Sequence, residues 1–206
     1  AAAGISLGMA GGTHHAIEDL AITSNMPNMT VIVPADAHQA WHATQATDDL
    51  DGPVYIRLGG RIEEPPVTPI DGPFQVGRAE TLRTGGDVAI IACGCMVAPA
   101  LAAAADLAGE GIDARVLNMH TIKPLDTDAV LAAAAETRGI VTAEEHRLTG
   151  GLGGAVAELL ATRHPAPMRM IGMPDEFAIV GPTDKVRQHY GMSSSHIADA
   201  ARQLAG

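Results

Sequence analysis

The stretch Gly11-Gly12-Thr13-His14-His15-Ala16-Ile17-Glu18-Asp19-Leu20 decides the fold, and the rest of the chain is organised around it. Its paired glycines permit a tight turn at low steric cost, and Thr13 can cap a helix that starts directly after the turn. The apolar spacing that follows predicts a helix over residues 14–24. We therefore expect His14 and His15 in a loop at a helix N-terminus, where an imidazole can hold an anion or share a proton. Ordinary loop histidines are the alternative, and the residues alone leave it open.

Strand and helix patterns alternate on both sides of this stretch. Residues 1–7 are expected to form the end of a strand and its exit loop, and the β-branched run 30–33 predicts another strand. Asp36 caps a predicted helix that extends to about Leu50, and residues 54–58 return to a strand pattern. This alternation predicts an α/β fold with a parallel sheet.

A proline-rich segment separates two such alternating units. Residues 61–73 have no helical period, so we predict an extended linker there between a first unit, residues 1–60, and a second unit, residues 74–206. The second unit repeats the pattern, with strands predicted at 88–92, 113–119, 139–143 and 167–171 and helices at 96–108, 125–135, 152–162 and 195–204.

The composition excludes several classes of partner. The 206 residues carry a net charge of −11, which argues against nucleic acid or an anionic membrane as a partner. The uncharged segment 88–105 is about as long as a minimal membrane-spanning helix, but its Gly94 and Pro99 fit a strand, a turn and a helix better. Cys93 and Cys95 are too close for an ordinary disulfide, so we expect reduced thiols in a cytoplasmic protein rather than a metal site.

A second polar cluster follows the strand predicted at 139–143. Glu145, His146 and the glycine-rich start of the next helix could form an acid–base or phosphate site. The alternative is that the glycines of 150–154 let the helix pack close to the strand beside a structural histidine. The residue types favour this second interpretation.

The opening stretch and the segment Pro27-Asn28-Met29-Thr30-Val31-Ile32-Val33-Pro34-Ala35-Asp36 together resemble the pyrimidine-binding domain of the transketolase family. Later motifs are similar to the transketolase C-terminal domain: Gly94-Cys95-Met96-Val97, Thr121-Ile122-Lys123-Pro124-Leu125-Asp126, Glu144-Glu145-His146, Gly150-Gly151-Leu152-Gly153 and Asp175-Glu176-Phe177. The resemblance covers the whole chain and points in particular to the C-terminal subunit of two-subunit bacterial transketolases. It implies part of a pyrimidine-binding domain followed by a parallel-sheet C-terminal domain.

The resemblance implies an enzyme that uses thiamine diphosphate and Mg²⁺ to transfer a two-carbon ketol unit from a ketose to an aldehyde. His14 stands at the motif position whose imidazole would bind substrate oxygens or move a proton, and His15 is a second candidate. Arg57 and Arg61 are candidate substrate-binding residues, because the family's phosphate-binding arginine falls at Gly60 here and Arg61 follows it by one position. Interface or solvent-exposed charges are the alternative for both arginines.

Several family positions depart from the pattern. The family's Glu-Asp pair is Met9-Ala10 here, which leaves the selectivity for a sugar hydroxyl open. The family's cofactor-activating glutamate lies upstream of residue 1, and Glu18 does not match its motif position. The Mg²⁺–diphosphate motif belongs to a different domain of the family. No cofactor-binding or metal-binding residue is therefore assigned to this chain.

From these departures we expect the missing walls of the site to come from an upstream piece or a diphosphate-binding transketolase subunit. The expected assembly is a dimer of such heteromers that acts on a small-molecule sugar, and this chain alone is expected to be inactive. Two alternatives stay open. One is a non-catalytic assembly subunit, and the other is a relative of deoxyxylulose-phosphate synthases or of the β subunits of 2-oxoacid dehydrogenases, which share these motifs.

Overall fold

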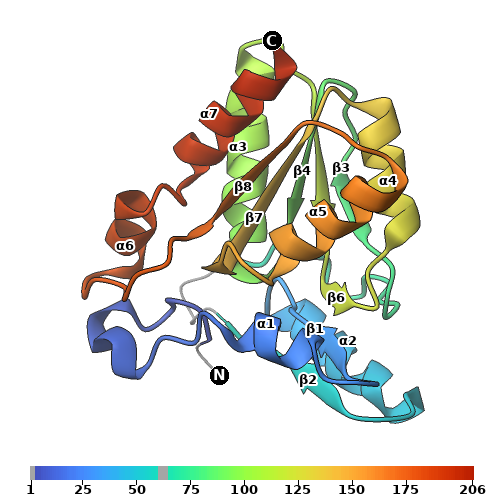
Figure 1. Cartoon of the computed structure of the whole chain (residues 1–206), viewed down its shortest axis with the longest axis vertical. Helices are drawn as coiled ribbons and strands as arrows, with labels where there is room; N and C mark the ends of the chain where they lie inside the picture. The colour runs from blue at the N-terminus through green and yellow to red at the C-terminus, as the bar shows by residue number, and fades with distance from the viewer. Residues whose placement is uncertain (1–2, 60–64) are drawn as a thin grey trace.

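Two α/β units make up the chain in a computed structural model that describes residues 3–59 and 65–206 (Figure 1). The N-terminal unit contains η1 (Gly8–Thr13), α1 (Asp19–Ser24), β1 (Thr30–Ile32), α2 (Ala37–Ala46), η2 (Thr47–Asp49) and β2 (Val54–Ile56). The C-terminal unit contains β3 (Glu80–Arg83), β4 (Val88–Ala92), η3 (Gly94–Met96), α3 (Val97–Gly109), β5 (Ala114–Asn118), β6 (Thr121–Lys123), α4 (Thr127–Glu136), β7 (Ile140–Arg147), α5 (Leu152–Arg163), β8 (Met168–Met173), α6 (Thr183–His189) and α7 (Ser194–Ala205).

Five strands form the sheet of the C-terminal unit in the order β3-β5-β4-β7-β8. All neighbours are parallel except β3, which runs antiparallel to β5. Every residue of β4 is buried, because helices cover both faces of the sheet and its apolar sequence is unbroken. Ile90 packs in the cluster with α3 and α7, whereas Ile91 packs with α4 and α5 on the other face (Figure 1). The predicted α/β class with a parallel sheet is confirmed.

The uncharged segment 88–105 is a strand followed by a helix, as predicted. It forms β4, η3 and the start of α3, with Pro99 in the first turn of that helix. None of the helices in the described ranges combines the length and the apolarity that crossing a bilayer requires. Cys93 and Cys95 are buried free thiols in the turn between β4 and α3.

A strand from the C-terminal unit completes the small sheet of the N-terminal unit. That sheet has the order β2-β1-β6, and β6 pairs antiparallel with β1. The sequence predicted no strand at these residues and a helix from residue 125; α4 begins at Thr127, and the Asp126 side chain caps it by accepting from Ala129 N. A three-residue strand has no periodicity of its own, so only its tertiary partner β1 reveals it. The two units are thereby joined through backbone hydrogen bonds.

The proline-rich segment packs against the N-terminal unit in the part that the structure describes. Asp36 Oδ2 accepts from the backbone N–H groups of Val67 and Thr68, both at 2.6 Å, and the His42 ring lies 2.7 Å from the Ile70 carbonyl. Burial alone would raise the pKa of Asp36, but the hydrogen bonds from Gln39, Thr68 and Val67 lower it. Residues 65–73 are thus held along α2. The predicted boundaries at residues 60 and 74 stay a prediction.

Candidate functional site

The segment of residues 11–16, called the histidine loop below, includes the end of η1 and leads toward α1. Gly11 has a φ of +71°, and a Cβ there would lie 2.8 Å from Val180 Cγ2, so the turn requires glycine for its conformation and for its close packing. His14 is exposed, and its Nδ1 lies 2.9 Å from Thr13 Oγ1. The loop therefore presents one imidazole to solvent from a tightly constrained turn.

His15 is half-buried and has no hydrogen-bonding partner within the described residues. Both of its ring nitrogens are removed from solvent and contact no donor or acceptor there. An imidazole always carries one donor or acceptor at each nitrogen, and leaving buried polar atoms unpaired costs free energy. The position therefore fits a polar group that comes from outside the described chain.

The helix after the loop starts later than predicted. α1 begins at Asp19, not at residue 14, and Thr13 is the last residue of η1 instead of a helix cap. Ala16 explains the delay, because it forms an isolated bridge with Gly4: Gly4 N donates to Ala16 O at 2.8 Å, and Ala16 N donates to Gly4 O at 3.1 Å. An extended residue cannot also be helical, so the histidines lie one extended segment before the helix and not at its N-terminus.

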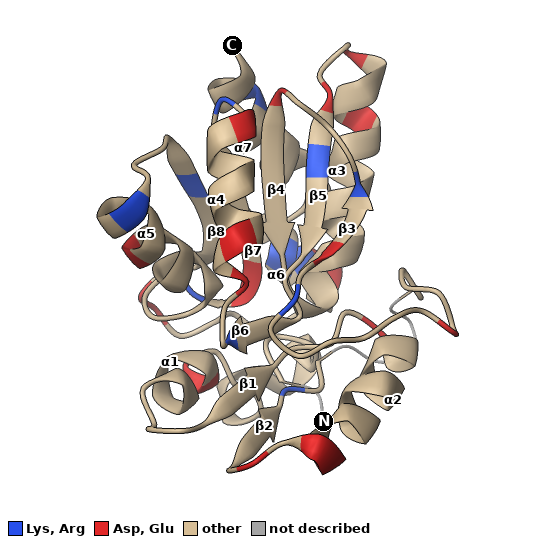
Figure 2. Cartoon of the chain, turned by 90° about the vertical axis from the view of Figure 1, so that its right-hand side faces the viewer, with Lys and Arg blue, Asp and Glu red and all other residues tan. Residues whose placement is uncertain are grey.

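Near the loop, ionisable side chains gather where the two units meet. We call this group the joint cluster, and its members are Asp19, Arg57, Glu144, Glu145, His146 and Arg187. Figure 2 shows acidic residues on β7 at this level, with basic residues of α6 behind them. The N-terminal unit contributes two members, β7 contributes three, and α6 contributes one. These charges are within the protein and each has a partner of opposite charge or a backbone group.

Arg57 occupies the centre of the joint cluster and is 3% exposed. Its Nε donates to Asp19 Oδ2 at 2.7 Å, and its Nη2 donates to the carbonyls of Ala16 at 2.7 Å and Glu145 at 2.9 Å. Burial alone would lower the pKa of Arg57, but the hydrogen bond and charge of Asp19 raise it, so the guanidinium stays charged. Its predicted contact with substrate stays a prediction that these internal contacts do not favour. Arg61, the other predicted arginine, lies outside the described residues.

Glu144 lies at the N-terminus of α5, entirely removed from solvent. Its two carboxylate oxygens accept from the backbone N–H groups of Leu152 and Gly153, both at 2.7 Å. A Cβ on Gly151 would lie 2.0 Å from Glu144 Oε2, so this glycine leaves the room that the carboxylate needs. Burial raises the pKa of Glu144 to about 7, although the two N–H groups and Arg57 oppose that shift.

His146 is fully buried beside Glu144, and both of its ring nitrogens are engaged. Nε2 accepts from Ala21 N at 3.2 Å, and Nδ1 lies 2.8 Å from the Arg147 carbonyl, so the ring is neutral with its proton on Nδ1. Burial lowers the pKa of His146 accordingly. The contacts of Glu144 and His146 agree with the packing interpretation of this motif rather than with an acid–base site.

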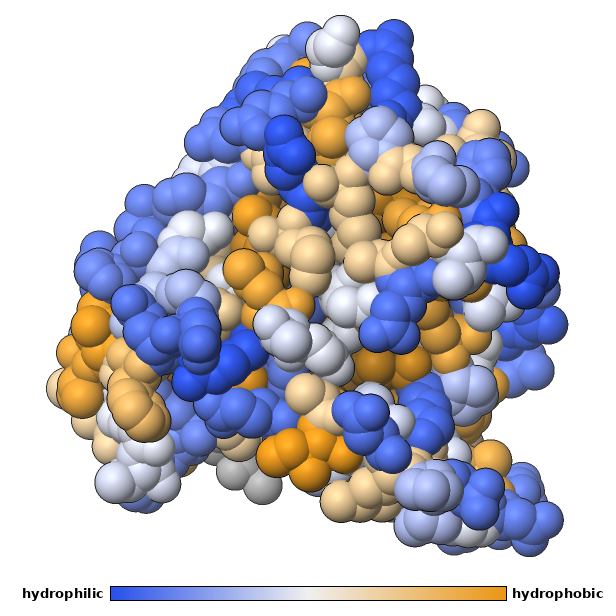
Figure 3. All heavy atoms as spheres, viewed as in Figure 1, coloured by the Kyte–Doolittle hydropathy of each residue, from blue (hydrophilic) through white to orange (hydrophobic). Residues whose placement is uncertain are grey.

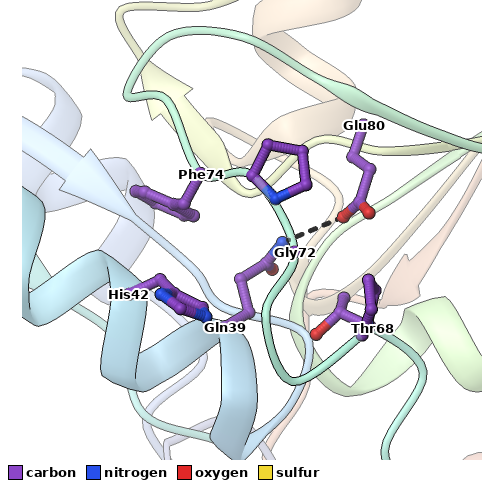
Figure 4. Close-up of a pocket in the computed structure, with 8 residues that line it drawn as sticks. Gln39, His42, Thr68, Gly72, Phe74 and Glu80 are labelled. Carbon is purple, nitrogen blue, oxygen red and sulfur yellow. Dashed lines mark hydrogen bonds between the residues drawn. The ribbon is translucent and has the colours of Figure 1, made fainter.

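Two hollows of the described surface lie away from the histidine loop. The one in Figure 4 is lined by residues of α2, β3 and the proline-rich segment, with Gln39 donating to Glu80 Oε2 at 3.3 Å. Its volume of about 10 Å³ holds no more than one water molecule. The second, of about 230 Å³, is lined by Lys123, Glu158 and neighbouring residues of α1 and α5. Neither hollow is lined by His14 or His15.

No metal site is formed by the described residues alone. Within residues 3–59 and 65–206, no three or more His, Cys, Asp or Glu side chains are grouped so as to hold a metal ion. The groups that this chain could offer to a cofactor and its substrate are the exposed imidazole of His14 and the unpaired nitrogens of His15.

An exposed apolar patch adjoins the histidine loop. It consists of Met9 and the segment that follows β8, with Phe177 90% exposed and Val180 63% exposed; Ile179 completes it. Gly181 N donates to Gly8 O at 3.1 Å, which ties that segment to η1. Figure 3 shows hydrophobic residues gathered at the left edge of this face, where η1 and the segment after β8 lie in Figure 1. Apolar side chains exposed together in this way mark an interaction surface.

The sequence pattern did not show that Glu145 and His146 join Arg57 and Arg187 in one cluster, and it gave no sign of the apolar patch. The run Glu144-Glu145-His146 directly follows an apolar stretch and belongs to the same buried strand, which is a signal for buried polar groups that need partners. The partners Arg57 and Arg187 lie 88 and 42 positions away from Glu145, so the sequence did not identify them.

Fold and site together define a two-unit α/β protein in which the histidine loop lies next to the buried joint cluster. The family model described as "Transketolase, pyrimidine binding domain" matches residues 1–61, and the one described as "Transketolase, C-terminal domain" matches residues 77–197. This chain belongs to the transketolase family.

Characterised relatives extend this finding. The chain is 46% identical over 204 residues to the 6-deoxy-6-sulfo-D-fructose transketolase subunit SqwH of Clostridium sp. (strain MSTE9), covering 98% of this chain and 62% of that protein. It is 40% identical over 202 residues to one of the subunits of the apulose-4-phosphate transketolase of Phocaeicola vulgatus, covering 98% of this chain and 64% of that protein.

A solved structure matches nearly the whole chain. It is described as "Split gene transketolase, inactive beta4 tetramer", with a TM-score of 0.90 and 41% identity, and the match covers 99% of this chain and 65% of that one. This chain therefore spans less than two thirds of the length of the three relatives.

Proposed function

We propose that this chain is part of a thiamine-diphosphate-dependent transketolase-type enzyme, which transfers a two-carbon ketol unit from a ketose to an aldehyde. The observation that carries the proposal is the histidine loop, which is exposed beside an apolar patch in a chain of the transketolase family. The similarity to two proteins named as transketolase subunits supports it.

Thiamine diphosphate, when bound, supplies the carbanion chemistry of such a transfer. This chain would contribute the histidine loop to that site. The exposed ring of His14 is able to hydrogen-bond sugar oxygens and to move a proton between them, because the two nitrogens of an imidazole can donate and accept protons. The unpaired ring nitrogens of His15 would hydrogen-bond polar groups of the substrate or of a neighbouring subunit.

The diphosphate and Mg²⁺ would be held by residues outside the described chain, on a diphosphate-binding transketolase subunit. The apolar patch around Phe177 and Val180 supports such a partner, because it adjoins the histidine loop and would be covered on assembly. We propose a dimer of these heteromers in the cytoplasm, where the two buried thiols stay reduced.

For the donor we propose a ketose with an anionic group. One similar protein is named for a sulfo sugar and another for a sugar phosphate, and Arg61 is a candidate to meet the anion. An arginine binds a phosphate or a sulfonate by paired N–H groups. An Arg61→Met variant would raise KM for an anionic donor more than for an uncharged one if this assignment holds.

The test is reconstitution with the diphosphate-binding subunit. The two proteins are co-expressed, and ketol transfer is measured with and without thiamine diphosphate on a panel of ketose phosphates and sulfo-ketoses with an aldehyde acceptor. We expect cofactor-dependent transfer by the pair and none by this chain alone. Decarboxylation of pyruvate or a branched oxoacid instead would support the alternative relatives, and no turnover by any assembly would support a non-catalytic assembly subunit.

A further inference from the structure

The side chain of Arg57 binds the segment that directly follows the candidate histidines. Arg57 Nη2 donates to the Ala16 carbonyl at 2.7 Å, and Ala16 directly follows His15. The same guanidinium donates to the carboxylate of Asp19, the first residue of α1, from Nε to Oδ2 at 2.7 Å and from Nη2 to Oδ1 at 3.1 Å. Arg57 therefore fixes both ends of the short extended stretch that separates the histidines from the helix.

The guanidinium is in turn anchored to the C-terminal unit. Its Nη2 donates to the Glu145 carbonyl on β7 at 2.9 Å. The Glu145 side chain accepts from Ile5 N at 3.3 Å and from Arg187 Nε at 2.6 Å, which ties the turn before η1 and helix α6 to the same residue. These contacts connect the histidine loop to two elements of the other unit.

A second contact supports the same segment from β7. Arg147 N donates to the Ile17 carbonyl at 2.9 Å, one residue beyond the carbonyl that Arg57 binds. Two consecutive carbonyls after the histidines are thus bound by the joint between the units. A lysine at position 57 would keep the charge, but its single ammonium cannot reproduce the planar fork that reaches Asp19, Ala16 and Glu145 together.

We propose that Arg57 is a positioning residue, which holds the histidine loop in register with the C-terminal unit and acts on the reaction through His14 and His15. The inference rests on the proposed function for its kinetic part, while its structural part concerns this chain alone. Arg57 is 3% exposed and its contacts are internal, so it reaches the reaction only through the loop that it holds. This assignment differs from direct substrate binding, and the two have different kinetic consequences.

The kinetic test uses the reconstituted assembly with Arg57→Lys. Because a misplaced loop weakens transition-state contacts, we expect kcat to fall about 10- to 100-fold with KM within about threefold of wild type. Arg115→Lys is the matched control, since Arg115 also donates to a carbonyl and to a carboxylate, those of Gly85 and Glu136, outside the joint cluster. A rise in KM with unchanged kcat would overturn the proposal in favour of substrate binding, and unchanged kinetics would overturn it as well.

The spectroscopic test needs no activity and therefore separates a failure of this inference from a failure of the proposed function. In the full chain labelled with ¹⁵N-histidine, we expect the ring signals of His14 and His15 to shift or broaden in Arg57→Lys and to stay in place in Arg115→Lys. Asp19→Asn serves as a second variant if Arg57→Lys does not fold, because it weakens the ion pair between residue 19 and Arg57 and leaves the arginine in place. Ring signals identical to wild type in the folded variants would overturn the proposal, whatever the assembly does.

Discussion

The two units differ in how far each is stabilised by its own buried core. In the C-terminal unit, β4 has five residues, all buried, between four helices. In the N-terminal unit, β1 and β2 have three residues each, and every residue of β2 is only half-buried. The apolar side chains of the N-terminal unit join the same two clusters that cover β4, with Ile17 in one and Leu20 in the other. The N-terminal unit is therefore built on the core of its neighbour, and its histidine loop depends on the joint between them.

The largest stability effect should come from the core of the C-terminal unit. Ile90→Ala removes a fully buried side chain from the central strand, which should lower the free energy of unfolding by about 2–5 kcal/mol. Val54→Ala on the half-buried β2 is the matched comparison and should cost about 1 kcal/mol or less. Urea unfolding of both variants measures the difference. A larger loss for Val54→Ala would reverse the comparison between the units.

The next effect is a loss of stability in acid that comes from His120, whose carbonyl accepts from Val33 N across the joint. Burial lowers the pKa of His120 to about 4, while the charge of Asp126 opposes the shift. In the unfolded chain His120 binds a proton near pH 6.5, whereas in the folded chain it stays neutral down to about pH 4. The contribution of the neutral ring to the free energy of unfolding is therefore complete above pH 6.5 and is lost as the pH falls toward 4. It amounts to roughly 3 kcal/mol over that window.

Replacement by a ring that cannot titrate isolates this effect. His120→Phe keeps an aromatic side chain against Phe74, whose ring centroid lies 4.3 Å from that of His120. Relative to wild type, the variant should gain stability as the pH is lowered from 7 to 4, measured by urea unfolding at each pH. Parallel pH profiles of the two proteins would contradict the assignment.

Glu144 should make the free energy of unfolding change with pH in the opposite direction. Burial raises its pKa to about 7, so between its ordinary value of 4.5 and 7 the folded chain holds a proton that the unfolded chain releases. Its contribution is present below pH 4.5 and is lost as the pH rises through 7, by roughly 2 kcal/mol between about pH 5 and about pH 6.5. In Glu144→Gln this pH dependence of the free energy of unfolding should vanish. The amide also leaves one of the two N–H groups of α5 without an acceptor, which lowers stability at every pH. A slope equal to that of wild type would show that Glu144 does not titrate in this range.

The smallest effect is expected on the surface of the C-terminal unit. Arg202, which is half-buried, pairs with the exposed Glu110 and Asp199 between α7 and the end of α3. Exposed ion pairs contribute little, because water and salt screen them. Arg202→Ala should therefore leave Tm unchanged within error at 0.15 M salt, whereas a drop of several degrees would show that this surface pair supports the core.

The sequence predicts the C-terminal unit better than the joint, for a physical reason. A strand such as 88–92 and the turn and helix after it carry their own signals in β-branched residues, Gly94 and Pro99, so local patterns sufficed. The strand β6 and the late start of α1 are set by pairing with β1 and Gly4, which no local pattern contains. The tight glycine turn before the histidines followed from its own residues, but their expected place at a helix N-terminus was wrong.

Arg57 shows the same limit within the candidate site. As an arginine after a strand it resembled a substrate-binding residue, and only the fold reveals that Glu145 and Ala16 use its donors. Residues with local partners could thus be predicted, and residues that bridge the units could not.

The central claim is that the histidine loop works on substrate in the assembled enzyme, and His14→Ala tests it most directly. In the reconstituted pair, loss of an acid–base or hydrogen-bonding imidazole should lower kcat/KM for ketol transfer by about two to three orders of magnitude. The exposed His164 beyond α5 provides the control, since His164→Ala should retain the wild-type rate. Wild-type turnover by a folded, assembled His14→Ala variant would contradict the account.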